Sequence, residues 1–388
     1  MRLLQVDVTK LFGLFHHTIS INTTDSITII HGPNGYGKTI ILHLINALFH
    51  STFSDLRSTP FHTFTLTFDD GSRLVVIREV KKDKDTNITV QLASRGMETV
   101  SYSPRLHTRP SDLEFPLGMI EDLVPDLERT ALSSWLHRAT GEVLGVDQVV
   151  ERYGQLFPPR HRTAVPEWLE ERTRTIPVRI IETQRLLSSQ SARRTRTYDR
   201  AAQMIPTVTA DTEELAAIIQ RTLAEYGTLS QSLDRSFPSR VVRASEPAEL
   251  SNEQLTVKLR ELEEKRTRLT EAGLLDRDND PNFEVPQHVE DRTRGLLSVY
   301  VSDTEQKLGV FDNLYQKVEL LQRSINDKFH HKTLYINKAA GFLFRSDDGT
   351  TLAPTNLSSG EQHELVLLYE LLFKVSPGSL IMIDTDPS

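Results

Sequence analysis

The sequence contains no cysteine in 388 residues, which excludes a disulfide framework and any cysteine-based metal site. The N-terminal segment Met1–Asp7 lacks the apolar core of a signal peptide, and no run approaches a membrane span, so we expect a cytoplasmic protein without membrane contact. Positive charge is not in excess either. The net charge of −8 argues against a protein that coats nucleic acid over its whole surface. The length is sufficient for two or three domains with cores of their own.

One glycine-rich stretch organises the chain. Residues 32–39, Gly-Pro-Asn-Gly-Tyr-Gly-Lys-Thr, fit the Walker A pattern G-x-x-x-x-G-K-[ST]. Glycines let the backbone curl so that successive N–H groups point at phosphate oxygens. Lys38 supplies a positive charge for the β- and γ-phosphates, and the Thr39 hydroxyl is placed to ligate Mg²⁺. The candidate nucleotide-binding residues of this loop are Gly32, Asn34, Gly35, Gly37, Lys38 and Thr39.

The flanking residues support this motif. Ile27–Ile30 predicts a buried strand that runs into the loop, and Ile40–Phe49 has the apolar spacing of a helix that leaves it. The partial positive charge of that helix N-terminus would lie under the phosphates. The sequence therefore predicts a nucleotide-binding protein, in preference to a glycine-rich turn that matches by chance.

Residues 1–103 form the predicted N-terminal part of an ATPase head, in which alternating apolar residues after position 63 indicate an antiparallel β lobe. Residues 104–206 are predicted as a proline-punctuated insertion with a buried strand at Val178–Ile181 that leads to Gln184. Eight arginines and two acids lie between Arg172 and Arg200. This stretch could track the phosphates of DNA, although a charge run is more often a solvated face.

Residues 207–332 are predicted as a helical insertion. Asp211 with Glu214 and Ser251 with Gln254 have the spacing of capping boxes at helix starts. A last long helix carries an apolar seam through Phe311 and beyond, so we expect a short coiled coil or antiparallel bundle. These helices could pack a lid domain or bind a partner, and the sequence leaves both readings open.

Residues 333–388 are predicted to return to the ATPase head. Two short strands precede Leu357–Gln362, a Leu-Ser-Ser-Gly-Glu-Gln phrase that opens an apolar helix. The run Ser379–Asp384 is apolar and ends in an acid, which is the form of a Walker B strand. An aspartate at the tip of such a strand can hold Mg²⁺ through water.

The phosphate loop, Gln184, Leu357–Glu361 and Asp384 occur in the order of an ABC-type ATPase head, and this order resembles SMC-like proteins, double-strand-break repair ATPases and the OLD family. The phrases at 29–35, 181–186 and 357–362 resemble more closely the bacterial AAA family ATPases of anti-phage defence loci, of the OLD/AriA (PARIS) kind. The resemblance implies an α/β fold: a P-loop NTPase ABC-type head with an antiparallel β lobe and a helical, short coiled-coil insertion.

The same resemblance implies ATP and Mg²⁺ as cofactors and a homodimer or higher homo-oligomer. Each ATP would lie between one phosphate loop and the partner's signature, where Ser358, Gly360 and Glu361 meet the nucleotide. The helix N-terminus after Ser358 suits an anion. Binding and hydrolysis would then switch the helical lobe or a bound effector nuclease.

The resemblance also implies catalytic roles for Lys38, Gln184 and Asp384, with Gln184 and Asp384 joining Thr39 as metal ligands. One position departs from the pattern, because Thr385 follows the Walker B aspartate where such heads carry a catalytic Glu. The chain ends at Ser388, before the expected remaining strands and switch histidine. We expect a truncated or split product, or a protein with weak ATP turnover.

Two other functions remain open at this point. An SMC- or RecF-like DNA-repair ATPase would clamp DNA, and would show DNA-stimulated hydrolysis with a steep salt dependence. A nucleotide-stabilised scaffold would bind ATP without productive hydrolysis, for which Thr385 is the best evidence.

Overall fold

The structure is a computed structural model. It describes residues 1–80, 86–104, 118–124, 127–131, 133–137, 143–153, 156, 165–182, 187–189, 204–243, 250–276 and 291–384. Its contacts divide the chain into two units. Unit 1 comprises Met1–Gln184, Ser189–Met204 and Val375–Ser388, and unit 2 comprises Arg185–Ser188 and Ile205–Lys374. Residues 333–374, predicted as part of the ATPase head, thus group with the helices.

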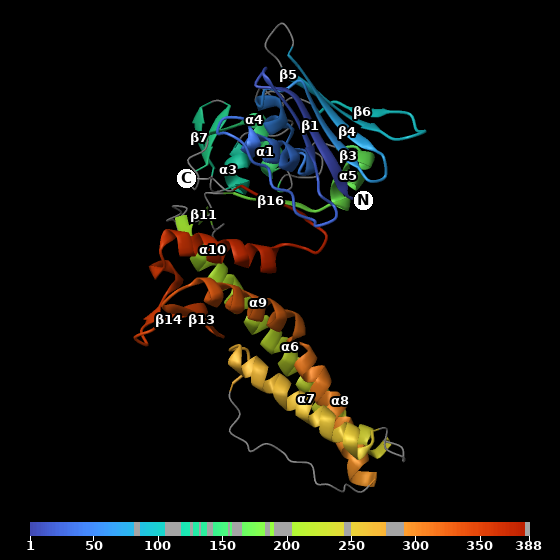
Figure 1. Ribbon diagram of the computed structural model, residues 1–388, viewed down its shortest axis with the longest axis vertical. Coiled ribbons are helices and arrows are strands. Elements are labelled where there is room, and N and C mark those ends of the chain that lie inside the picture. The colour runs from blue at the N-terminus through green and yellow to red at the C-terminus, as the bar shows by residue number, and fades with distance from the viewer. Residues whose placement is uncertain are drawn as a thin grey trace. The chain divides into compact units, whose positions relative to one another are not determined.

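Unit 1 is built on a six-stranded antiparallel sheet of order β2-β1-β3-β4-β5-β6 (Figure 1). In β3 every second residue is buried, and Phe64, Leu66 and Phe68 face the core while threonines alternate with them. The strands are β1 (Leu3–Leu11), β2 (Phe15–Ser20), β3 (Thr63–Phe68), β4 (Arg73–Val80), β5 (Thr86–Ala93) and β6 (Val100–Tyr102).

Helices α1 (Lys38–Phe49), α2 (Phe53–Ser58) and α5 (Glu167–Thr175) share one apolar core with this sheet. Beside α1 lies a second, parallel pair of strands, β10 (Val178–Ile181) and β16 (Leu380–Ile383), in the register Ile181↔Ile383. Parallel pairing brings the carboxyl ends of both strands to the same edge.

A smaller cluster in unit 1 has its own core around the fully buried Trp135. Its link to the main core is polar, because Arg57 on α2 forms an ion pair with Asp147 at 2.5 Å. The cluster contains α3 (Gly118–Leu123), β7 (Leu127–Ala131), β8 (Ser134–His137), β9 (Val143–Gly145) and α4 (Val146–Tyr153).

Unit 2 is entered near β11 (Leu187–Ser189) and β12 (Met204–Pro206), which pair with each other. Its long helices are α6 (Thr207–Arg243), α7 (Asn252–Glu271), α8 (Asp291–Gly309) and α9 (Asp312–Lys328). Helix α8 packs against both α6 and α7 (Figure 1). The apolar seam is buried along its length, so the predicted helical bundle is present as a packed core.

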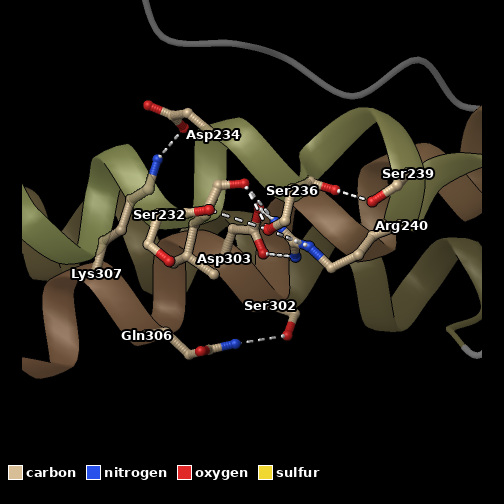
Figure 2. Close-up of polar contacts among 10 residues, drawn as sticks. Ser232, Asp234, Ser236, Ser239, Arg240, Ser302, Asp303, Gln306 and Lys307 are labelled. Atoms are coloured by element: carbon tan, nitrogen blue, oxygen red, sulfur yellow. Dashed lines mark hydrogen bonds and ion pairs between the residues drawn. The ribbon is translucent and has the colours of Figure 1, made fainter.

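Polar contacts also join α6 to α8 (Figure 2). Arg240 on α6 makes a two-point contact with Asp303 on α8, with 2.7 Å between Nη2 and Oδ2, and Lys307 donates to Asp234 at 2.7 Å. Pro238 lies inside this turn of α6 and has no N–H to donate to the preceding turn. The Arg240 guanidinium also donates to the Leu233 carbonyl in the preceding turn of α6, at 2.8 Å.

The end of unit 2 returns to mixed structure. A three-stranded antiparallel sheet is followed by helix α10 and a π-helical turn, η5. The elements are β13 (Lys332–Asn337), β14 (Gly341–Ser346), β15 (Thr351–Leu352), η4 (Pro354–Asn356), α10 (Ser359–Tyr369) and η5 (Glu370–Lys374).

At this end, Lys374 of η5 donates to the buried carboxylate of Asp211 on α6 at 2.6 Å. This ion pair connects the last residue of unit 2 to the first turns of α6.

One predicted helix start is wrong. Helix α6 begins at Thr207, so Asp211 lies inside the helix and its carboxylate binds Lys374 instead of capping with Glu214. The last long helix is confirmed as α9, in which Leu314, Val318, Leu321 and Ile325 are buried. The capping box of Ser251 and Gln254 is confirmed at the start of α7. In the described part of the chain, no helix is long and apolar enough to cross a membrane.

A candidate nucleotide-binding site

The glycine-rich loop adopts a backbone that its glycines require. Gly35 and Gly37 have φ angles of 84° and 82°, in the left-handed region that other residues rarely occupy. Gly37 also has no room for a side chain, since a Cβ there would lie 2.5 Å from Leu11 Cδ2 on β1. Gly37 is the N-cap of α1, so the loop leads directly into a helix N-terminus, as the motif predicts.

Lys38 is the first residue of α1, and its side chain turns back over the loop. Its ammonium group donates to the carbonyls of Gly32 at 2.8 Å and Pro33 at 2.9 Å. Because both partners are neutral carbonyls, its positive charge has no carboxylate partner in these two contacts. An ammonium held above a curled backbone suits the recognition of phosphate oxygens.

The structure brings Thr39 and Asp384 together across 345 positions of sequence. Thr39 Oγ1 donates to Asp384 Oδ1 at 3.1 Å. Asp384 is fixed at the end of β16 by its own backbone, since its N–H donates to the Ile181 carbonyl of β10 at 2.9 Å. A hydroxyl and a carboxylate oxygen beside a phosphate loop are the hard oxygen ligands that Mg²⁺ prefers, so these residues fit that ion.

One prediction about this site is wrong. Residues 27–30 carry no strand, and Ile27 and Ile29 are 69% and 81% exposed instead of buried. The physical reason is the absence of a neighbour: β16 pairs with β10, and no described strand forms a ladder along 27–30. Sequence propensity alone cannot form a strand without a partner.

Other predicted positions are either described away from this contact or not described. Asn34 lies in the exposed part of the loop. Gln184 and Thr385 lie outside the described residues. β10, which leads to Gln184, is confirmed as a strand, although only Ile181 is fully buried in it.

The predicted signature residues lie in unit 2, at the start of α10. Ser358 is the N-cap, and its hydroxyl and backbone N–H both donate to Glu361 at 2.8 Å in a capping box. Burial by itself raises the pKa of Glu361, but hydrogen bonds from Lys332 and Ser358 outweigh it and hold the pKa below its usual value. Lys332 binds both carboxylate oxygens at 2.9 Å. Gly360 is exposed between these residues.

The described part of the Arg172–Arg200 stretch is engaged within unit 1. Arg172 pairs with Asp70 at 2.5 Å, and Arg174 pairs with Glu170 at 3.2 Å. Hydrogen bonds from Ser72 and then Arg172 lower the pKa of Asp70 to about 2. These are two separate ion pairs, and the remaining arginines of the stretch fall largely outside the described residues.

A family profile described as an AAA domain matches residues 10–328, which is well over half of the chain. The chain belongs to this AAA-domain family. Proteins of the family are nucleotide-binding ATPases that take ATP with Mg²⁺. The matched range includes the phosphate loop and the long helices, while Ser358 and Asp384 follow it. A comparison with curated proteins gives no significant match.

Sequence reasoning missed two features of this AAA-domain protein. Aromatic residues of the β1–β2 hairpin pack beside the phosphate loop, where Phe15 lies 5.0 Å from Tyr36 between ring centroids. The buried ion pair of Asp211 and Lys374 was also missed, because the two residues are 163 positions apart. The motif pattern gave no signal for Phe15, and only the tertiary contact reveals it.

Proposed function

We propose that this chain is an ATP-operated switch protein. The single observation that carries the proposal is the contact of Thr39 with Asp384, 3.1 Å between the side-chain oxygens. It joins the phosphate loop to the acid after β16, as a Mg²⁺-nucleotide site requires. When bound, Mg²⁺ would neutralise phosphate charge. Lys38 would hold the phosphates, while Thr39 and Asp384 would hold the ion.

The proposed switch rests on how the backbone connects unit 2 to the metal-site aspartate. The backbone leaves unit 2 at Lys374 and reaches Asp384 through Val375 and β16, so the signature helix and the metal-site acid are connected by one short segment. We propose that ATP binding and hydrolysis bias the arrangement of the two units.

The finer proposal follows the resemblance to ABC-type heads. Two copies would enclose ATP between the phosphate loop of one and the Ser358–Glu361 end of α10 in the other. Lys332 supports this proposal, because it compensates the charge of Glu361 at a helix end that must accept an anion. The resemblance to anti-phage defence ATPases further suggests that the switch controls an effector nuclease.

The test is ATP binding by isothermal titration on the full chain, with and without Mg²⁺. Lys38→Ala should abolish binding, while Asp384→Asn should remove most of the Mg²⁺-dependent gain in affinity and leave Mg²⁺-free binding within about twofold. Ser379→Ala, at a half-buried side chain before β16, is the matched control and should bind normally. If Asp384→Asn kept the full Mg²⁺-dependent gain in ATP affinity of the wild type, the result would contradict the site.

Two further measurements address the finer proposal. Sedimentation of the wild-type chain with ATP and Mg²⁺ should show a dimer, and Gly360→Arg at the α10 terminus should keep the protein monomeric without changing nucleotide affinity. Single-turnover hydrolysis of wild type and Thr385→Glu then measures catalysis. Faster hydrolysis by Thr385→Glu would assign the slow turnover to that position.

A further inference from the structure

Buried charged groups hold the Trp135 cluster, which comprises α3, β7, β8, β9 and α4, against helix α2. Asp147 and Glu151 lie four residues apart on α4, and both approach the guanidinium of Arg57 on α2. The side chains of Arg57, Asp147 and Glu151 are 6%, 15% and 8% exposed. Two carboxylates therefore share one guanidinium at a place that is largely shielded from water.

The guanidinium is shared unequally. Asp147 Oδ2 lies 2.5 Å from Arg57 Nη1, whereas Glu151 Oε1 lies 3.7 Å from the same nitrogen, which is beyond hydrogen-bond distance. The other terminal nitrogen, Nη2, donates to the Pro104 carbonyl at 3.0 Å. Glu151 instead accepts from Ser54, whose N–H and hydroxyl donate to Oε2 at 2.7 and 2.6 Å. One oxygen of Glu151 is thus well hydrogen-bonded, and the other has only the long contact with Arg57.

This environment favours the neutral form of Glu151. Burial raises the pKa of Glu151 to about 7, and the hydrogen bonds from Ser54 oppose this rise. The charge of Asp147 raises the pKa further, and that of Arg57 lowers it. Among the described residues, Arg57 is the one cation within 4 Å of the Glu151 carboxylate. Glu151 therefore exchanges a proton near neutral pH at the contact between α2 and α4.

Two other charged or titratable groups lie close to this contact. On β8, the His137 ring stacks on Tyr153 of α4, with 6.5 Å between ring centroids. On β4, Arg78 donates through Nε to the backbone carbonyl of Arg57 at 2.9 Å. Neither group binds the Glu151 carboxylate, so the proton of Glu151 is the one that changes the charge between α2 and α4.

We propose that Glu151 is a proton-operated latch between α2 and the Trp135 cluster. With the proton bound, a neutral carboxyl group packs beside the ion pair of Arg57 with Asp147 and keeps both Ser54 hydrogen bonds. With the proton lost, a second buried negative charge lies beside Asp147, and only the shared guanidinium offsets it. The cluster then docks less tightly. Three residues separate α2 from α1, so the latch acts next to the helix that begins at the phosphate loop.

The direction of the pH dependence follows from the proton affinity of the two states. In the undocked cluster Glu151 is a solvated carboxyl group with its ordinary pKa of 4.5, whereas docking raises the pKa to about 7. Docking is therefore strongest below pH 4.5, weakens as pH rises from 4.5 to 7, and is level above that window. Between pH 6 and 8 the equilibrium constant for opening should rise about tenfold.

The test is hydrogen exchange measured by mass spectrometry on the full chain at pH 6 and 8, corrected for the intrinsic exchange rate at each pH. Peptides that contain Ser54 or α4 report the latch, because the Ser54 N–H is itself a donor to Glu151. Their protection in the wild type should fall about tenfold from pH 6 to 8. Glu151→Gln keeps an acceptor for Ser54 and cannot ionise, so its protection should not vary with pH. Glu121→Gln, the same change at an exposed residue of α3, is the matched control and should behave like the wild type.

A second measurement follows the proton directly. Infrared difference spectra between pH 6 and 8 should show the loss of a protonated-carboxyl band that Glu151→Gln lacks. Both spectra are recorded in an Asp211→Asn background, because Asp211 is another buried carboxyl group. Absence of the band with Glu151 in place would overturn the latch, and so would protection that stays flat from pH 6 to 8. A pH dependence that persists in Glu151→Gln would assign the titration to His137 and would also overturn it.

Discussion

Asp211 is a buried carboxylate whose charge destabilises the helical unit at neutral pH. It is 1% exposed, and burial raises its pKa from 3.8 to about 6, although the hydrogen bond from Lys374 opposes this rise. Glu370 and Glu214 also face this group and raise the pKa further. We therefore predict that Asp211→Asn, which mimics the protonated acid, makes unit 2 more stable at neutral pH.

The magnitude follows from the pKa difference between the folded and unfolded states. A rise of about two pH units corresponds to about 3 kcal/mol, at about 1.4 kcal/mol per unit. The folded state holds the proton more tightly, so the stability of the wild type falls as pH rises through 3.8 to 6 and is level above that window. The Asn variant has no such loss, and Lys374 retains Glu214 and Glu370 as partners.

The assay is urea unfolding followed by circular dichroism at 222 nm, which reports mainly the long helices. Both tryptophans, Trp135 and Trp168, belong to unit 1, so their fluorescence reports the other unit separately. The difference in unfolding free energy between Asp211→Asn and wild type should be near zero at pH 4. It should reach up to about 3 kcal/mol in favour of the variant at pH 7.5.

Glu213→Gln is the matched control, because it makes the same chemical change on α6 at an exposed side chain. Its difference from wild type should not vary with pH. A flat pH dependence for Asp211→Asn would refute the reasoning, and so would a variant that loses stability at neutral pH. Either result would mean that the ion pair with Lys374 outweighs the burial of the carboxylate.

Three other substitutions test the geometry. Gly37→Ala adds a Cβ 2.5 Å from Leu11 Cδ2 at a φ of 82°, so ATP affinity in titrations should fall at least about tenfold, from a strain of about 1–2 kcal/mol or more. Ser358→Ala removes an N-cap and should destabilise unit 2 by about 1 kcal/mol in urea unfolding. Arg240→Met leaves Asp303, 5% exposed, without its ion pair and should lower stability by about 1–3 kcal/mol. Adding Asp303→Leu should restore much of that loss, and an unrecovered double variant would contradict the ion-pair account.

Local patterns predicted the elements whose shape depends on nearby residues. The alternation of Phe64, Leu66 and Phe68 predicted β3, and the glycine spacing predicted a phosphate loop that enters a helix at Lys38. Ser251 with Gln254 predicted the start of α7, because a capping box is formed within one turn, and the Leu357–Gln362 phrase predicted the start of α10. These features depend on residues a few positions apart, so they can be predicted from the local sequence.

Features that depend on distant partners could not be predicted in the same way. Ile27–Ile30 has the composition of a strand, but no described neighbour pairs with it, so it forms no strand, and Ile27 and Ile29 are exposed. Asp211 fits a capping pattern, but it lies inside α6, where its buried carboxylate forms an ion pair with Lys374. The contact of Thr39 with Asp384 was expected only from the order of motifs, and its geometry comes from the pairing of β10 with β16.

The end of α10 limits how the signature can bind a nucleotide. The Ser358 hydroxyl already donates to Glu361 and accepts the Glu361 N–H, so that side chain is committed to the capping box. The carboxylate of Glu361 would repel a phosphate, but Lys332 binds both of its oxygens and compensates its charge. The first N–H groups of a helix have no partner within it. An anion at this end would therefore be bound by backbone N–H groups around Gly360, and a serine contact would require the capping box to open.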